Sequence, residues 1–360
     1  MQPPPRGRRV WISAPQPADG HVTAVVSSGA HYSRDGSIVL VRCDGGTGEE
    51  QQVAVADILP YSDPAGEDDL ADMRDVHAPA LVHCLAMRSA SAHGLFTACG
   101  PSAVVWLNPH APTPALWSDE QMRSSAGMDA SSARRPHVFK LAEDAVQDLL
   151  KADPGDAAFV LVRGLSDAGK TALAARVARY WLWRLSAQGL APRIGAAVGS
   201  VDATDALLRR FSHCDTALTA FGNARAGAPD CSLHSRTAHV AINSRGGLHS
   251  LTLRAWGLER GRVTAPPQDD GAFHAYYLVL HSMQLARRGD PVAPSDFGML
   301  RSVAAAPDGA RRMAADFTLL QTALGPDGLQ LQARERGLLW SIVEGLLHLG
   351  NWRPGGRDAE

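Results

Sequence analysis

Long hydrophobic runs are missing from this 360-residue sequence, and so is an excess of charge of one sign. No apolar run approaches the length of a membrane span, and the basic, proline-rich residues 1–9 are not followed by an apolar core of signal-peptide length. We therefore expect neither membrane insertion nor secretion. The formal net charge of −2 argues against a nucleic-acid binder, because such proteins concentrate positive charge.

Cysteine is scarce, and its spacing lacks the patterns that indicate metal or disulfide chemistry. No C-x-x-C pair is present, and the odd number of cysteines argues against a disulfide framework. This usage predicts a reducing, cytoplasmic compartment. The five cysteines are Cys43, Cys84, Cys99, Cys214 and Cys231.

The length and the 45% content of hydrophobic residues are sufficient for one large domain and a small one. Residues 10–60 show short apolar runs separated by turn residues, which predicts a small SH3-like β module after a disordered N-terminus of residues 1–9. The module is either a peptide-binding surface or a structural appendage, and the lack of an aromatic cluster favours the appendage. The four predicted strands are Val10–Ile12, Gly20–Val26, Ser37–Arg42 and Gln52–Ile58.

The most informative stretch is GLSDAGKT, from Gly164 to Thr171. It follows the apolar run Phe159–Val162, a predicted strand, and precedes an alanine-rich helical segment. Glycines let successive N–H groups face phosphates, Lys170 supplies a cation, and the Thr171 hydroxyl can bind Mg²⁺. The alternative is a glycine turn before a helix, which the flanking strand and helix make a poor explanation.

The rest of the chain alternates predicted helices and strands, so we expect an α/β fold. The run Ala103–Leu107 predicts a strand, and Val240–Ile242 with Leu248–Leu253 predicts a hairpin. Predicted helices cover residues 81–87, 136–149, 200–220 and 337–351.

A series of short blocks, in one order along nearly the whole chain, resembles the N-terminal half of a myosin motor head. Besides the phosphate loop, these blocks read EDDL, APALVHCL, VVWLNPH, PHVFKLAEDA, FGNAR, GLERGRV, FHAYY and LLHLGN. The resemblance implies that residues 61–360 form part of a P-loop NTPase-type sheet flanked by helices. It also implies ATP or ADP and Mg²⁺ as ligands, actin filaments as partner, and a place in the cytoplasm and cytoskeleton.

The resemblance also implies which residues bind the nucleotide. The loop departs from the family's GESGAGKT at Leu165 and at Asp167, where a carboxylate adds like-charge repulsion and restricts the backbone. We therefore expect weakened nucleotide affinity. The implied nucleotide-binding residues are Gly164, Leu165, Ser166, Asp167, Ala168, Gly169, Lys170 and Thr171 in the loop, Asn108 and Pro109 near the adenine, and Asn223 in the FGNAR block.

A degenerate segment stands where the family has switch I, the loop that senses the γ-phosphate. Without a gap, Asp230 and Ser232 match, while Leu233 and His234 replace a metal-binding serine and an arginine. A shifted register would place Ser235 and Arg236 on those two positions instead. The resemblance implies that Thr171 binds Mg²⁺ together with one serine of this segment, either Ser232 or Ser235. In either register we expect hydrolysis to be impaired more than binding.

The family's switch II motif, D-I-x-G-F-E, would follow the last block, and this sequence does not contain it. We expect that the chain alone cannot complete a motor cycle, so no catalytic residue is assigned. The family's central sheet takes strands from both halves of the head, which predicts exposed sheet edges and a partner that covers them. Two main hypotheses remain: a motor-head fragment that binds ATP, and a non-motor relative with a relic or sensory nucleotide site. An unrelated P-loop kinase or ATPase explains the other blocks less well.

Overall fold

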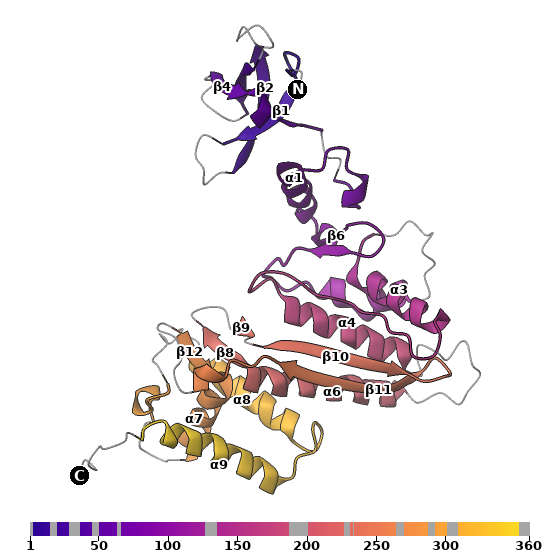
Figure 1. The fold of residues 1–360 in the computed structure, drawn as a ribbon. Coiled ribbons are helices and arrows are strands. Elements are labelled where there is room, and N and C mark those ends of the chain that lie inside the picture. The colour runs from indigo at the N-terminus through magenta and orange to yellow at the C-terminus, as the bar shows by residue number, and fades with distance from the viewer. Residues whose placement is uncertain are drawn as a thin grey trace. The chain divides into compact units, whose positions relative to one another are not determined.

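A computed structural model describes residues 3–14, 20–28, 37–44, 50–62, 66–126, 135–186, 201–226, 231–232, 234–263, 270–286, 292–300 and 309–352 (Figure 1). These residues divide into two compact units. The first contains residues 1–121 and 128–141, and the second contains residues 122–127 and 142–360. Helices and strands occur in both, in agreement with the predicted α/β class at a coarse level.

The first unit begins with an antiparallel five-stranded sheet in the order β4-β3-β2-β1-β5. The first three predicted strands are confirmed, and a short fifth strand pairs with β1. The fourth, predicted at Gln52–Ile58, is confirmed only as far as Ala54, because Val55–Asp57 forms a 3₁₀ turn. Gly7 N–H donates to the Val26 carbonyl at 2.8 Å, so the ordered sheet begins before residue 10. The strands are β1 (Arg9–Ser13), β2 (His21–Ser28), β3 (Ile38–Cys43), β4 (Glu50–Ala54) and β5 (Leu59–Pro60).

The sheet has an apolar core because alternate side chains of its strands point inward. That the module is SH3-like stays a prediction. The buried side chains that form the core are Val10, Ile12, Ala24, Val26, Val39, Val41, Val55 and Ile58.

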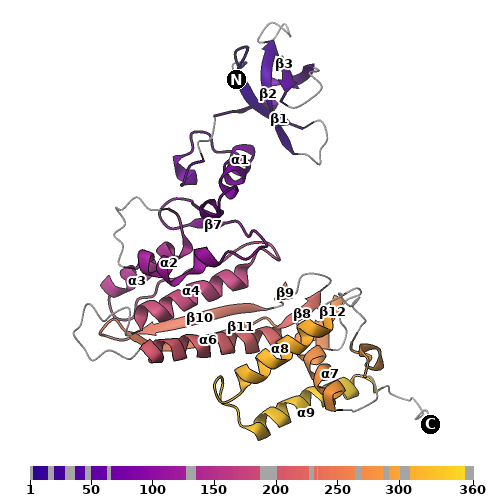
Figure 2. The same cartoon turned by 180° about the vertical axis from the view of Figure 1, so that it is seen from behind.

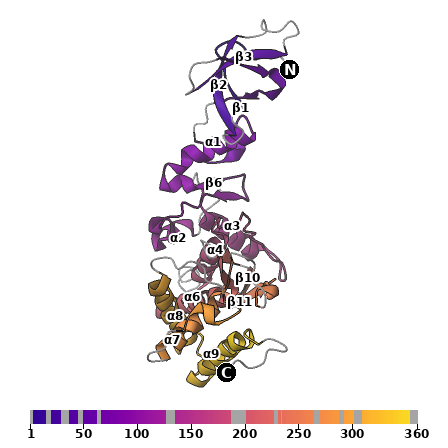
Figure 3. The same ribbon diagram turned by 90° about the vertical axis from the view of Figure 1, so that its left-hand side faces the viewer.

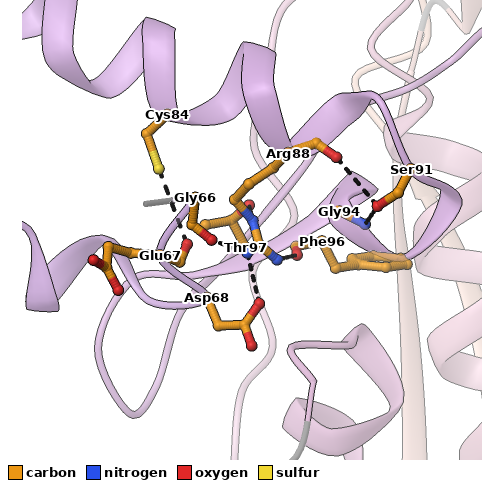
Figure 4. A network of polar contacts seen from close by, with 9 residues as sticks. All are labelled: Gly66, Glu67, Asp68, Cys84, Arg88, Ser91, Gly94, Phe96 and Thr97. Carbon is orange, nitrogen blue, oxygen red and sulfur yellow. Dashed lines mark hydrogen bonds and ion pairs between the residues drawn. The ribbon is translucent and has the colours of Figure 1, made fainter. Parts of the chain in front are cut away.

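A buried arginine joins α1 (Ala78–Ser89) to β6 (Phe96–Ala98) (Figure 4). Arg88 Nε donates to Thr97 Oγ1 at 2.8 Å, and its two Nη atoms donate to the Gly66 and Phe96 carbonyls and to Asp68 Oδ1. Every nitrogen of the buried guanidinium is therefore bonded, which offsets the cost of removing its charge from water. Further elements here are β7 (Val104–Trp106) and the 3₁₀ turns Val55–Asp57, Leu70–Asp72, Ala92–Leu95 and Pro114–Trp117. Helix α2 (Asp119–Ser125) begins in this unit and continues in the second.

In the second unit, helices pack around two small sheets. The long hairpin β10–β11 runs beside α4 and α6 (Figures 1 and 2), and β8 lies between β9 and β12. The helices are α3 (Val138–Lys151), α4 (Lys170–Leu185), α6 (Val201–Gly222), α7 (His274–Ala286), α8 (Gly309–Leu324) and α9 (Ala333–Leu349). The strands are β8 (Asn223–Ala226), β9 (Cys231–Ser232), β10 (Ser235–Ile242), β11 (Leu248–Trp256) and β12 (Asp270–Phe273), and the 3₁₀ turns are Arg260–Val263 and Pro294–Asp296.

The main core of this unit lies around α7, which packs against α6, α8 and α9 (Figure 3). Tyr276 and Tyr277 are buried there, as expected for an aromatic helix face. Leu320 of α8 and Leu347 of α9 are fully buried. Among the described residues, no helix is both long and apolar enough to cross a membrane.

The strand predicted at Phe159–Val162 is wrong as a paired strand. Among the described residues, this segment joins no sheet. Its side chains nevertheless alternate in exposure: Phe159 is 89% exposed and Leu161 78% exposed, whereas Val160 and Val162 are half-buried. The alternation of a strand is thus present without a neighbouring strand to complete the ladder. The strands of the described residues form four separate sheets, and no single P-loop sheet joins them.

Candidate functional site

The loop Gly164–Gly169 leads directly into α4, and its backbone needs glycine at two points. Gly164 has φ 157° and Gly169 has φ 77°, values that side-chain-bearing residues rarely adopt. Asp167 has φ 64° although it carries a side chain. The loop therefore has a left-handed backbone at Asp167, where the family's loop has glycine. This agrees with the backbone restriction expected at that residue.

Lys170 folds back on the loop in this structure. Its Nζ donates to the Leu165 carbonyl at 2.6 Å, and the same carbonyl accepts from Ala168 N at 3.3 Å. Gly169 at the N-cap has no side chain to satisfy the first N–H groups of α4. The start of a 16-residue helix and a lysine ammonium thus lie together, which is an arrangement suited to phosphate oxygens.

A buried ion pair anchors the far end of α4 to α3. Arg184 Nε donates to Glu143 Oε2 at 3.0 Å, and the two side chains are 3% and 1% exposed. Tyr180 O–H donates to the same Oε2 at 2.8 Å, and Gln147 Nε2 donates to Oε1 at 2.6 Å. Burial, and after it the Glu143 carboxylate, raises the pKa of Tyr180, so this hydroxyl stays a donor. The helix that carries Lys170 and Thr171 is therefore firmly held.

The second half of the site is a hydroxyl from a distant part of the chain. Ser232 Oγ lies 3.1 Å from Thr171 Oγ1, which brings β9 to the first turn of α4. Two hydroxyl oxygens at hydrogen-bonding distance are hard ligands of the kind that Mg²⁺ accepts beside phosphate oxygens. The donor set therefore fits Mg²⁺ bound with a nucleotide. Among the described residues, no group of three His, Cys, Asp or Glu side chains could hold a metal ion.

Of the two serines left open by the sequence, the structure brings Ser232 to Thr171. Ser235 is exposed on β10, where it pairs with Trp256 of β11. Arg236 points to α6, where Nη1 donates to Asp215 Oδ1 at 2.5 Å. Asp230 and Leu233 lie outside the described residues.

Asn223, also predicted at the site, pairs with Ser232 across β8 and β9. Its Oδ1 atom is buried and has no hydrogen-bond partner among the described residues. A buried acceptor in this position costs free energy unless a donor reaches it. Asn223 therefore lies next to the candidate metal ligand.

Asn108 and Pro109 belong to the other unit, so their predicted contact with adenine stays a prediction. Locally they form a turn after β7, in which Asn108 Oδ1 accepts from His110 N at 3.2 Å. His110 has φ 50°, which such a turn accommodates.

Sequence reasoning missed the residues that contact His234 and Arg236, namely Asp215, Thr219 and Gly222 of α6. They form no motif, and they lie 12 to 21 residues before the residues that they contact. The one local sequence signal for these contacts was the FGNAR block. Its glycine, Gly222, is the residue that the His234 ring lies against.

Comparisons with known proteins identify a family for the chain. The family model described as myosin head (motor domain) matches residues 67–356. Myosin-13 and Myosin-17 of Arabidopsis thaliana are each 26% identical to the chain over 96% of its length, and the matches cover 22% and 21% of those proteins. Unconventional myosin-Vb of Mus musculus is 24% identical over 61% of the chain and 11% of its own length. The chain spans about a fifth of the length of the plant relatives.

Proposed function

Because the chain belongs to the myosin head (motor domain) family, we propose that it binds ATP and ADP with Mg²⁺ through Gly164–Thr171. The observation that carries the proposal is the meeting of Lys170, the start of α4 and the Thr171–Ser232 hydroxyl pair. Lys170 and the loop N–H groups would hold the phosphates, and the two hydroxyls would hold the metal, which supplies positive charge against the phosphate oxygens.

Lys170 must exchange its partner when a nucleotide binds. Its ammonium now donates to the Leu165 carbonyl, a neutral acceptor. A phosphate oxygen is a charged acceptor and forms a stronger hydrogen bond. The exchange therefore favours the bound state.

Slow hydrolysis is part of the proposal. The support is the position of Arg236, whose three guanidinium nitrogens already donate to His234, Asp215 and Thr219. Asp167 adds a second cause, because its carboxylate lies in the phosphate loop. A phosphate-release assay with saturating MgATP should give a turnover far below that of a complete motor head.

As a member of the motor-head family, the chain would work in actin-based motility, in the cytoplasm and cytoskeleton. Residues 10–60 would be an SH3-like module and residues 61–360 the P-loop core. A further protein segment would cover the exposed side chains of Phe159 and Leu161, since apolar groups in an unpaired strand favour strand addition.

Titration with fluorescent ATP and ADP, with Mg²⁺ and with EDTA, tests the nucleotide site. We expect saturable binding that Mg²⁺ strengthens, and a loss of about 10-fold to 150-fold in Lys170→Ala, since a charged hydrogen bond contributes about 1.5–3 kcal/mol. Lys151→Ala is the matched control, because Lys151 is an exposed lysine at the end of α3. Equal affinity in Lys170→Ala and the control would refute the assignment.

A further inference from the structure

All three nitrogens of the Arg236 side chain are used within the second unit. Nη1 donates to Asp215 Oδ1 at 2.5 Å, Nη2 donates to Thr219 Oγ1 at 3.0 Å, and Nε donates to His234 Nε2 at 2.8 Å. The first two partners lie on α6, and Arg236 lies on β10 (Figure 1). The planar guanidinium thus ties the start of β10 to the C-terminal half of α6 by directional bonds.

His234 continues this network to the end of α6. Its Nδ1 lies 3.0 Å from the Gly222 carbonyl, which can only accept, and its Nε2 faces Arg236 Nε, which can only donate. The ring is therefore neutral, with its proton on Nδ1. Burial, more than the charge of Arg236, lowers the pKa of His234, in agreement with this assignment.

The fit of His234 against α6 requires a glycine. A Cβ atom on Gly222 would lie 2.3 Å from His234 Cε1 and 2.5 Å from Nδ1, closer than atoms can approach. Gly222 immediately precedes β8, whose first residue, Asn223, pairs with Ser232. Ser232 is thus paired with β8, and His234 lies two residues further along the chain.

We propose that Arg236 is a positioning residue for the metal side of the site. It fixes His234, and through it the segment that places Ser232 beside Thr171, before any nucleotide binds. The inference rests on the proposed nucleotide function and adds a property to it. Because the serine is already beside Thr171, both ADP and ATP should gain affinity from Mg²⁺, and in both cases the gain should depend on Arg236.

The decisive quantity is the ratio of nucleotide affinity with Mg²⁺ to affinity with EDTA, measured for ADP and for ATP. In Arg236→Gln we expect this ratio to fall about tenfold, as is typical when groups behind a metal ligand are removed, while affinity in EDTA stays within about twofold because Lys170 is unchanged. Arg236→Lys keeps a cation for Asp215 but loses the donor to His234. Its affinity ratio should lie between those of the unmodified protein and Arg236→Gln. Arg254→Gln, an exposed arginine on β11, is the control.

Gly222→Ala provides an independent variant, since it displaces His234 without changing a charge. It should lose the same Mg²⁺-dependent gain. Hydrogen exchange of the nucleotide-free protein should also quicken around Cys231 and Ser232 in both variants, a readout that needs no nucleotide. A full Mg²⁺ gain in folded Arg236→Gln and Gly222→Ala overturns the inference and leaves the nucleotide site intact. If the unmodified protein binds no nucleotide in either buffer, both proposals fail.

Discussion

Two ion pairs hold the two sides of the candidate site, and they differ greatly in burial. Glu143 and Arg184 behind the phosphate loop are 1% and 3% exposed, whereas Asp215 and Arg236 behind Ser232 are 37% and 13% exposed. Partly exposed pairs contribute little to stability, while breaking a buried pair leaves an uncompensated charge. The phosphate side is therefore fixed with the fold, and the metal side is held by weaker contacts that can be changed without unfolding the protein.

The sharpest test of this difference is Arg184→Leu. It leaves Glu143 buried without its cation, and we expect the free energy of unfolding of the second unit to fall by about 3–5 kcal/mol. Urea denaturation followed by tryptophan fluorescence measures the change. The double variant Glu143→Leu/Arg184→Leu should recover part of the loss, although Tyr180 and Gln147 would lack their acceptor. A change below 1 kcal/mol in Arg184→Leu would contradict the role given to the buried pair.

The phosphate side can be improved at Asp167. Asp167→Gly removes a negative charge from the loop and suits the φ of 64°, so we expect nucleotide affinity to rise about fivefold to tenfold, for about 1 kcal/mol of repulsion removed. The gain should appear equally with Mg²⁺ and with EDTA, measured by the same titration.

Asp167→Asn separates the two causes, because it removes the charge and keeps a side chain. If Asp167→Asn and Asp167→Gly bind nucleotide equally well, charge alone explains the weakness. No gain in either variant would show that the carboxylate does not face the phosphates.

On the metal side, Asp215→Asn should cost only about 1 kcal/mol of unfolding free energy, because the carboxylate is more than one third exposed. The same urea titration as for Arg184→Leu gives the comparison directly. A loss as large as that of Arg184→Leu would erase the distinction between the two sides.

The smallest effect on stability is expected in the segment that leads to the phosphate loop. Replacing both Phe159 and Leu161 with threonine should change the unfolding free energy by less than about 0.5 kcal/mol per site, because both side chains are exposed. Self-association should decrease, as seen by sedimentation velocity, since the apolar groups favour edge pairing. If the unmodified protein already sediments as a single monomer at high concentration, the proposed need for a covering partner loses its support.

The two sides of the site were also unequally readable from the sequence. Lys170 and Thr171 were found because the phosphate loop is local: glycines, a lysine and a threonine within eight residues specify the turn and the helix start. The role proposed for Ser232 depends on its distance to Thr171, 61 positions away, and on Asp215 and Arg236. No spacing rule connects such residues, so the register of this segment stayed open until the structure brought them together.

The fold shows the same limit. The hairpin β10–β11, the helix α6 and the strands of the first module were predicted from periodicity and turn residues, which act locally. The strands β8, β9 and β12 were missed because they are only two to four residues long and owe their pairing to tertiary contacts. Phe159–Val162 shows the converse, because its pattern is that of a strand but no described neighbour pairs with it.

The contact between Gly222 and His234 has a consequence for how this sequence can change over generations. No side chain larger than hydrogen fits at residue 222 while the imidazole lies against that backbone. Replacement of the histidine by a small residue would remove the restriction and open residue 222 to alanine or serine. We therefore expect the two positions to change as a pair, because a Cβ atom at residue 222 displaces the imidazole.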